Sequence, residues 1–195
     1  DGELFVGRNV SAGTAAGVGT LFLNTGGQAT VMGNTRLGDP DGGTGTISMN
    51  GGTFNGDLPI SMELGSSIVG TGTVNADVSV VPGSIVATTA TGITMNGIIN
   101  NTGAGVFGTK IHFGSTGGYT GTGSCNVDIT GDTTAQITAT GALTLGKNTT
   151  AGVSYNGGLD VGTHDVTLVD TNQAVLGGLV EIDTGGELSC ASGIG

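Results

Sequence analysis

The segment Asp39-Pro40-Asp41-Gly42-Gly43 holds the residues best placed to bind a cation. Carboxylates at alternate positions of a loop supply the oxygen ligands that Ca²⁺ prefers. The pattern is incomplete, because Gly43 stands where an EF-hand has its next acidic ligand and Ile47 stands where a calcium β-roll has aspartate. Asp39 and Asp41 are therefore weak candidates for a metal site. A polar turn is the favoured interpretation.

A second group of residues, Asp160, His164 and Asp165, could form a metal site or an acid–base cluster because the three lie close together in the sequence. Adjacent residues of a strand face opposite sides, however, so these side chains need not converge. The only other histidine, His112, is far away in the sequence. A solvated turn is the favoured interpretation here.

Paired carboxylates suggest a third kind of chemistry. Asp128 with Asp132, or Asp165 with Asp170, could serve as the two acids of a glycoside hydrolase. Sugar-cleaving grooves usually carry stacking aromatic rings, and the chain has no Trp, two Tyr and five Phe. We therefore expect no catalytic residue, no cofactor and no enzyme activity.

Two cysteines, Cys125 and Cys190, leave two alternatives. They are either two small buried thiols or one disulfide that ties the last third of the chain, which would suit an oxidising compartment. The sequence does not give the distance on which a disulfide depends, so both alternatives stay open.

The charge of the chain excludes several partners. The net charge is −11, and the four basic residues, Arg8, Arg36, Lys110 and Lys147, are scattered. Nucleic-acid binding needs a basic patch, and an anionic membrane surface would repel this chain. No apolar run approaches the about 20 residues of a spanning helix. We expect no nucleic-acid partner and no membrane insertion, whereas a carbohydrate partner stays possible.

Glycine residues separate the short segments that must position these residues. The chain has 42 Gly in 195 residues, with short runs of Val, Ile, Leu and Thr between them. Such runs are too short for helices and are typical of short strands joined by tight turns. Val18-Gly19-Thr20-Leu21, Thr44-Gly45-Thr46-Ile47 and Thr71-Gly72-Thr73-Val74 recur about 26 residues apart, a period typical of solenoid coils.

Alternation within the runs supports the same fold. In Ile47-Ser48-Met49 and Ile93-Thr94-Met95 the apolar residues face one side and the hydroxyls face the other. Stacked coils would pair such strands in parallel around one core. We predict a single β-solenoid domain over residues 1–195, with a turn at Pro82-Gly83 and a long loop at 114–123. The coil shape changes near that loop, and the C-terminal region is a modified or capping one.

Threonine repeats raise one further possibility. Thr-Gly-Thr recurs at 44–46, 71–73 and 120–122. Flat ladders of Thr can order water or ice, but the uneven spacing argues against aligned rows. We therefore interpret these residues as ordinary β-branched strand residues.

Several of these segments resemble a known class of protein. Glu3-Leu4-Phe5-Val6-Gly7, Gly45–Phe54 and Gly70–Val74 resemble the repeats of autotransporter-passenger and PEP-CTERM-type secreted bacterial proteins. The order Val78–Val81, Pro82-Gly83 and Ile93–Gly97 is similar to the strand, Pro-Gly, strand-Gly ending of such passengers, and Asp165–Asp170 resembles their closing strand. The resemblance implies a right-handed parallel β-helix outside the cytoplasm, with no catalytic residues. Similar Gly/Thr-rich β-helices occur in phage fibres and capsid decorations, often as trimers.

The expected protein is thus all-β, a right-handed parallel β-helix. We expect a non-enzymatic extracellular structural protein, on a cell surface or a virion surface. It would act as a spacer, fibre or decoration that self-associates as a homo-oligomer, joins a larger surface assembly or displays loops. The resemblance to phage β-helices implies a trimer. The alternative is a carbohydrate-binding or polysaccharide-cleaving β-helix, such as a tailspike or adhesin.

Overall fold

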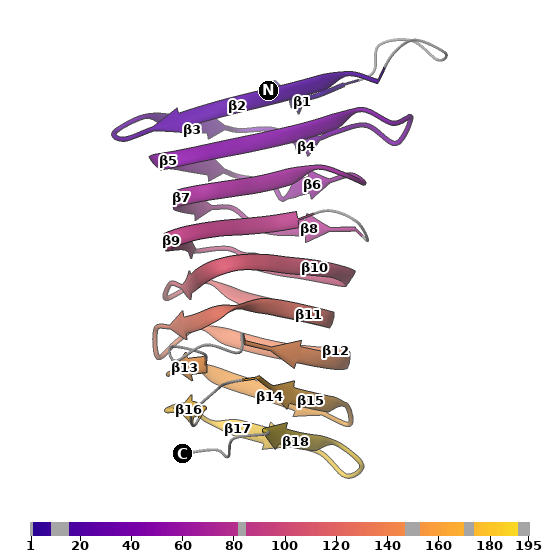
Figure 1. Cartoon of the computed structure of the whole chain (residues 1–195), viewed down its shortest axis with the longest axis vertical. Helices are drawn as coiled ribbons and strands as arrows, with labels where there is room; N and C mark the ends of the chain where they lie inside the picture. Colours follow the sequence, from indigo (N-terminus) through magenta and orange to yellow (C-terminus); the bar gives the residue numbers. More distant parts are fainter. Residues whose placement is uncertain (1, 9–15, 82–84, 147–152, 170–173, 191–195) are drawn as a thin grey trace.

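The computed structural model describes residues 2–8, 16–81, 85–146, 153–169 and 174–190. These residues form 18 strands and no helix. All of their pairings are parallel, and the chain winds into a β-solenoid of about 7 turns (Figure 1). The predicted all-β solenoid is therefore confirmed. Pro82-Gly83 lies outside the described residues.

Each turn of the chain crosses three faces of the rod in the same order, so three stacks of parallel strands run along the axis. Face 1 consists of β1 (Leu4–Val6), β4 (Thr35–Leu37), β6 (Ile60–Met62), β8 (Val78–Val80), the first parts of β10 (Ile98–Phe113), β11 (Gly118–Gly131) and β12 (Gln136–Leu145), β14 (Gly158–Gly162) and β17 (Val180–Ile182).

Faces 2 and 3 are built mainly from strands that bend around a corner of the rod. Face 2 consists of β2 (Val18–Asn24), the first parts of β5 (Thr44–Gly56), β7 (Ser67–Asn75) and β9 (Ile85–Met95), the middle of β10 and β11, the end of β12, β15 (Asp165–Leu168) and β18 (Glu187–Cys190). Face 3 consists of β3 (Gln28–Val31), the last parts of β5, β7, β9, β10 and β11, β13 (Val153–Tyr155) and β16 (Val175–Leu176).

The alternation predicted from the sequence builds the core. Ile47, Met49, Ile93 and Met95 are at most 3% exposed, while the residues between them face outward. Each fully buried side chain of this kind contributes about 1.5–3 kcal/mol. Because every coil places its apolar residues at the same register, the buried side chains of successive coils pack into one cluster through the rod.

Coil length varies, yet the strands stay in register. Hydrogen-bonded side chains at equivalent positions of neighbouring coils are 31 residues apart at Asn34 and Glu3 but only 18 apart at His112 and Thr130. The extra residues lie in the corners between faces. Uneven spacing in the sequence is therefore compatible with aligned strands.

The long loop predicted at 114–123 was wrong, because only residues 114–117 form a turn and β11 begins at Gly118. The glycines there serve close packing between strands. A Cβ on Gly118 would lie 2.1 Å from the carbonyl oxygen of Gln136, and one on Gly121 would lie 2.0 Å from that of Asn101. Glycine in a strand can mark such a close approach of two backbones.

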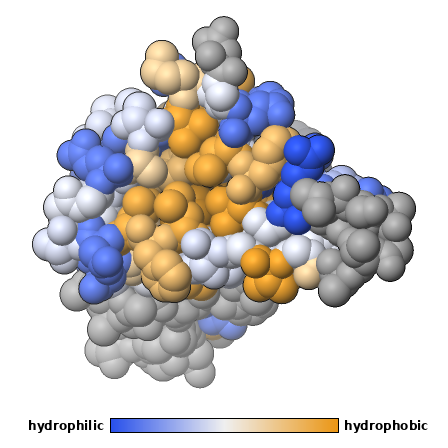
Figure 2. All heavy atoms as spheres, turned by 90° about the horizontal axis from the view of Figure 1, so that it is seen from above, coloured by the Kyte–Doolittle hydropathy of each residue, from blue (hydrophilic) through white to orange (hydrophobic). Residues whose placement is uncertain are grey.

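The N-terminal end of the rod exposes part of the apolar interior. Figure 2 looks down on this end, where apolar side chains gather in the middle of the cross-section. Leu4, Leu21, Ala29 and Val31 pack against the core but are only partly buried. None of the described residues belongs to a helix that could span a membrane.

Candidate functional site: a groove along one corner

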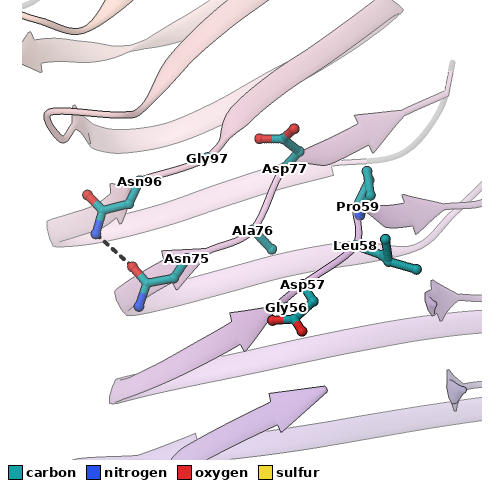
Figure 3. Close-up of a pocket in the computed structure, with 9 residues that line it drawn as sticks. All are labelled: Gly56, Asp57, Leu58, Pro59, Asn75, Ala76, Asp77, Asn96 and Gly97. Atoms are coloured by element: carbon teal, nitrogen blue, oxygen red, sulfur yellow. Dashed lines mark hydrogen bonds between the residues drawn. The ribbon is translucent and has the colours of Figure 1, made fainter. Parts of the chain in front are cut away.

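Three adjoining hollows follow the corner where face 3 turns into face 1. The first, of about 240 Å³, is lined by Asp57, Leu58, Pro59, Asn75, Asp77 and Asn96 together with small residues (Figure 3). The second shares Leu58 with it, and the second and third share Glu3 and Met32. We call this surface the corner groove; it is lined by Glu3, Thr30, Met32, Asp57, Leu58, Pro59, Asn75, Asp77 and Asn96.

A Thr-x-Asn pattern recurs at the ends of three strands and supplies Asn75 and Asn96 to the lining of the groove. Thr53-Phe54-Asn55 lies near the end of β5, Thr73-Val74-Asn75 ends β7, and Thr94-Met95-Asn96 spans the end of β9. The middle residue of each is 0% exposed, so the Thr and Asn side chains face outward. Thr53, Thr73 and Thr94 are register partners across the three coils.

The three asparagines form a hydrogen-bonded ladder. Asn75 Nδ2 donates to Asn55 Oδ1 over 2.6 Å, and Asn96 Nδ2 donates to Asn75 Oδ1 over 2.7 Å. Asn55 Nδ2 in turn donates to Thr30 Oγ1 over 3.4 Å. The central amide of Asn75 has two N–H donors and two oxygen lone pairs, and the ladder uses one of each. The ladder therefore fixes the amide planes and leaves one donor and one lone pair of Asn75 unused.

Two carboxylates lie at the turns beside the ladder. Asp77 Oδ1 accepts the backbone N–H of Ile98 over 2.8 Å, which fixes this side chain across the corner. Asp57 is exposed, and its backbone N–H donates to the carbonyl of Val31. None of the residues lining the three hollows is Lys or Arg. The groove is therefore acidic as well as rich in amides.

The Thr-Gly-Thr motifs do not align with one another, as their uneven spacing predicted, because Thr46 pairs with Ser67, Thr71 with Asn50 and Thr120 with Asn100. A row of threonines does form beside the ladder, but it includes only Thr73 of these motifs. The column Thr53, Thr73 and Thr94 continues through His112 and Thr130 in register. Within the part of the chain that the structure describes, the hydroxyls of Thr53, Thr73 and Thr94 make no hydrogen bond to the protein. They face solvent at about 4.8 Å intervals, the spacing of paired strands.

His112 contacts Thr130 and Asp132, two residues that the sequence analysis did not place beside it. Its Nδ1 lies 3.1 Å from Thr130 Oγ1, and its Nε2 lies 3.4 Å from Asp132 Oδ1. A hydroxyl, an imidazole and a carboxylate in contact can transfer a proton. However, the side chains of His112 and Asp132 are 37% and 50% exposed on a flat face, so solvent competes for each contact. Only the strand register across an 18-residue coil could have revealed this cluster.

The carboxylates proposed as a hydrolase pair are far apart. Asp128 lies on the outer side of β11 and Asp132 follows its end, with both facing outward. Four residues of extended strand span about 13 Å, beyond the separation that either hydrolase geometry uses. Asp128 is instead the register partner of Lys110. Asp170, the partner suggested for Asp165, lies outside the described residues.

The two weaker candidate clusters form turns. Asp39 Oδ1 accepts the backbone N–H of Asp41 over 2.9 Å, and the carbonyl of Asp39 accepts the N–H of Gly42. Asp160, His164 and Asp165 surround the turn at Gly162, and no hydrogen bond or ion pair joins their side chains in the described structure. No group of three or more His, Cys, Asp and Glu able to hold a metal occurs among the described residues.

The two cysteines occupy one inward-facing column. Cys125 pairs with Leu145, Leu145 with Leu168, and Leu168 with Cys190. Three strand spacings separate the cysteines by about 14 Å, twice the Cα distance that a disulfide tolerates. Neither cysteine is disulfide-bonded in the structure, which agrees with the thiol alternative. Burial raises the pKa of Cys125 to about 12, so this thiol stays protonated at neutral pH.

Comparison of the chain with protein-family models, with curated proteins and with solved structures finds no match. The functional assignment therefore depends on the geometry of the rod and its groove.

Proposed function

We propose that the chain is a non-enzymatic structural part of an extracellular protein, acting as a stiff spacer, fibre or decoration. The observation that carries this proposal is the unbroken stack of parallel strands around one core. A solenoid transmits length and stiffness because every coil is bonded to the next. The outward residues are mostly Thr, Ser and Asn, and only 10% of the chain is charged.

An extracellular location and right-handed winding are part of the same proposal. They are supported by the resemblance of the Glu3–Gly7 and Gly45–Phe54 segments to secreted bacterial repeats. Self-association is part of the same proposal, because parallel strands stacked in register, as in this rod, can be continued by a strand of another copy. Figure 2 shows the apolar cross-section to which such strands would add. The partner would be a second copy of the chain or a larger surface assembly.

The test combines native mass with a cleavage assay. Light scattering after size-exclusion chromatography should give a multiple of the 18.8 kDa chain if it self-associates. A trimer would favour a virion fibre or decoration, whereas a monomer would favour a segment of a longer secreted protein and would remove self-association from the proposal. Release of reducing ends from any polysaccharide would overturn the non-enzymatic assignment.

A second candidate function is carbohydrate binding. The specific observation that favours it is the corner groove, with its fixed amides and two carboxylates.

A further inference from the structure

We propose that the corner groove binds a neutral glycan chain that lies along the rod axis, across the turns that follow β5, β7 and β9. This inference rests on the second candidate function, carbohydrate binding, and deepens it by assigning a class of glycan to a defined surface. It holds whether the rod is an oligomer or a monomer.

The first argument is the fixed position of the polar groups. The hydrogen bonds from Asn75 to Asn55 and from Asn96 to Asn75 hold the amides before any ligand arrives. A planar amide that presents both a donor and an acceptor matches neighbouring sugar hydroxyls, which also donate and accept. Preorganised groups lose little entropy on binding, so a shallow groove can still hold a ligand.

The carboxylates narrow the class of ligand. Asp57 is exposed beside the ladder, and Asp77 has one oxygen committed to the N–H of Ile98. The remaining oxygens can accept strong, charge-assisted hydrogen bonds from hydroxyl groups. Glu3 adds a third negative charge, and the lining of the three hollows contains no Lys or Arg. Arg36 lines a further hollow beside Glu3, but it is paired with Glu63 over 3.2 Å, so an anionic polymer such as a polyuronate is still repelled. A neutral glycan fits these charges.

The groove also has exposed apolar side chains, against which a sugar ring can pack. Met32 is 65% exposed and Leu58 is 43% exposed, with Pro59 beside Leu58. In Figure 3, Leu58 and Pro59 lie on the opposite side of the hollow from Asn75 and Asn96. Binding sites commonly combine apolar lining with a few placed polar groups, and the C–H face of a sugar ring can pack against such side chains.

The repeat of the groove suits a polymer. Asn55, Asn75 and Asn96 follow one another at about 4.8 Å, the strand spacing, which is comparable to the length of one sugar ring. The three unpartnered hydroxyls of Thr53, Thr73 and Thr94 run parallel to the ladder. Successive sugars could therefore meet equivalent groups on successive coils.

A peptide is the less favoured occupant. Extended peptides commonly bind by adding a strand to an open sheet edge. Along face 3, β7 is already paired with β5 on one side and with β9 on the other. The backbone beside the groove is thus unavailable for that mode of recognition.

The experiment measures binding of cellohexaose, xylohexaose and mannohexaose by calorimetry, with a galacturonate oligomer as the anionic comparison and oligolysine as the peptide comparison. We expect at least one neutral hexasaccharide to bind and the galacturonate oligomer not to bind. Asp57→Ala and Asn75→Ala should each weaken binding about tenfold, the effect of one lost hydrogen bond to a charged or fixed group.

Matched controls lie on face 2, away from the groove. Asp165→Ala and Asn126→Ala remove the same side-chain types from exposed positions and should leave affinity unchanged. Asp57 is exposed, so its variant keeps the test valid even if Asn75→Ala lowers thermal stability. The proposal is overturned if no neutral hexasaccharide binds, if groove and control variants weaken binding equally, or if only oligolysine binds and salt abolishes it.

Discussion

The long-strand region, residues 44–145, and the short-strand region, residues 153–190, stack their coils alike but present different surfaces. In the first region β5, β7, β9, β10 and β11 run for 9 to 16 residues and bend around a corner. In the second, β13 to β18 have 2 to 5 residues each. Where these strands bend from face 2 onto face 3, register shifts such as those after Asn50 and Gly70 bring the residues that follow back into alignment, so a side-chain ladder can form on face 3.

The two regions also differ in charge, because the short-strand region is the more acidic. Residues 153–190 contain six acidic residues and neither Lys nor Arg: Asp160, Asp165, Asp170, Glu181, Asp183 and Glu187. Like charges on neighbouring coils repel. The short-strand region therefore offers an acidic surface without an amide ladder, and the long-strand region offers the groove. The comparison teaches that similar coils acquire different surfaces from strand length and outward residues alone.

The largest effect is expected from a substitution at the contact between the two regions. Phe113 of β10 packs edge-on against Tyr155 of β13, with ring centroids 6.4 Å apart, and both are at most 1% exposed. Phe113→Ala should lower the free energy of unfolding by about 3–5 kcal/mol, because it leaves a cavity at this junction. Urea unfolding measures the loss. Phe22→Ala, at a side chain 69% exposed, should change stability by less than about 0.5 kcal/mol.

Each region has a glycine at the corner between faces 3 and 1, where a Cβ would meet the backbone of the preceding coil. A Cβ on Gly97 would lie 2.0 Å from the carbonyl oxygen of Ala76, and one on Gly178 would lie 2.1 Å from that of Gly157. Gly97→Ala should cost about 3 kcal/mol, because β10, which follows Gly97, is held between β8 and β11 and cannot shift easily. Gly178→Ala should cost about 1 kcal/mol, because β17, which follows Gly178, pairs in the described structure with β14 alone. Thermal unfolding compares them, with Gly2→Ala as control because no atom lies near its Cβ. Equal losses would show that both corners are equally constrained.

The column shared by the cysteines gives a prediction on pH. Burial raises the pKa of Cys125 from 9.0 to about 12, so folding favours the protonated thiol. The stabilisation is present below pH 9 and is lost as pH rises toward 12. Between pH 8 and pH 10.5 this residue should remove about 2 kcal/mol of stability. Urea unfolding at the two pH values should show a smaller loss of stability for Cys125→Ala than for the wild-type protein, and an equal loss in both would contradict the prediction.

The smallest effect is expected from removing an asparagine at the same corner in each region. Asn75→Ala removes two ladder hydrogen bonds from a half-buried position and should cost about 1–2 kcal/mol. Asn156→Ala, at the matching corner of the short-strand region, removes an exposed side chain and should cost less than about 0.5 kcal/mol. Thermal unfolding distinguishes the two. A similar loss at Asn156 would mean that the ladder adds nothing to its coils.

The sequence by itself determined the strand pattern and the fold class. Alternation in Ile47-Ser48-Met49 is a local property, because side chains of a strand point to opposite faces whatever lies nearby. The same local rule failed at 114–123, where Gly118 and Gly121 look like loop residues. A glycine that bends a loop and a glycine that lets two backbones approach have the same letter, and only the neighbouring coil distinguishes them.

The tertiary structure alone decided the groove. Asn55, Asn75 and Asn96 are separated by 20 and 21 residues, and they meet because the corners absorb the differences in coil length. His112 meets Thr130 and Asp132 for the same reason. Alignment between coils is set by backbone hydrogen bonds among distant strands, and no local pattern in the chain encodes the length that each corner takes up.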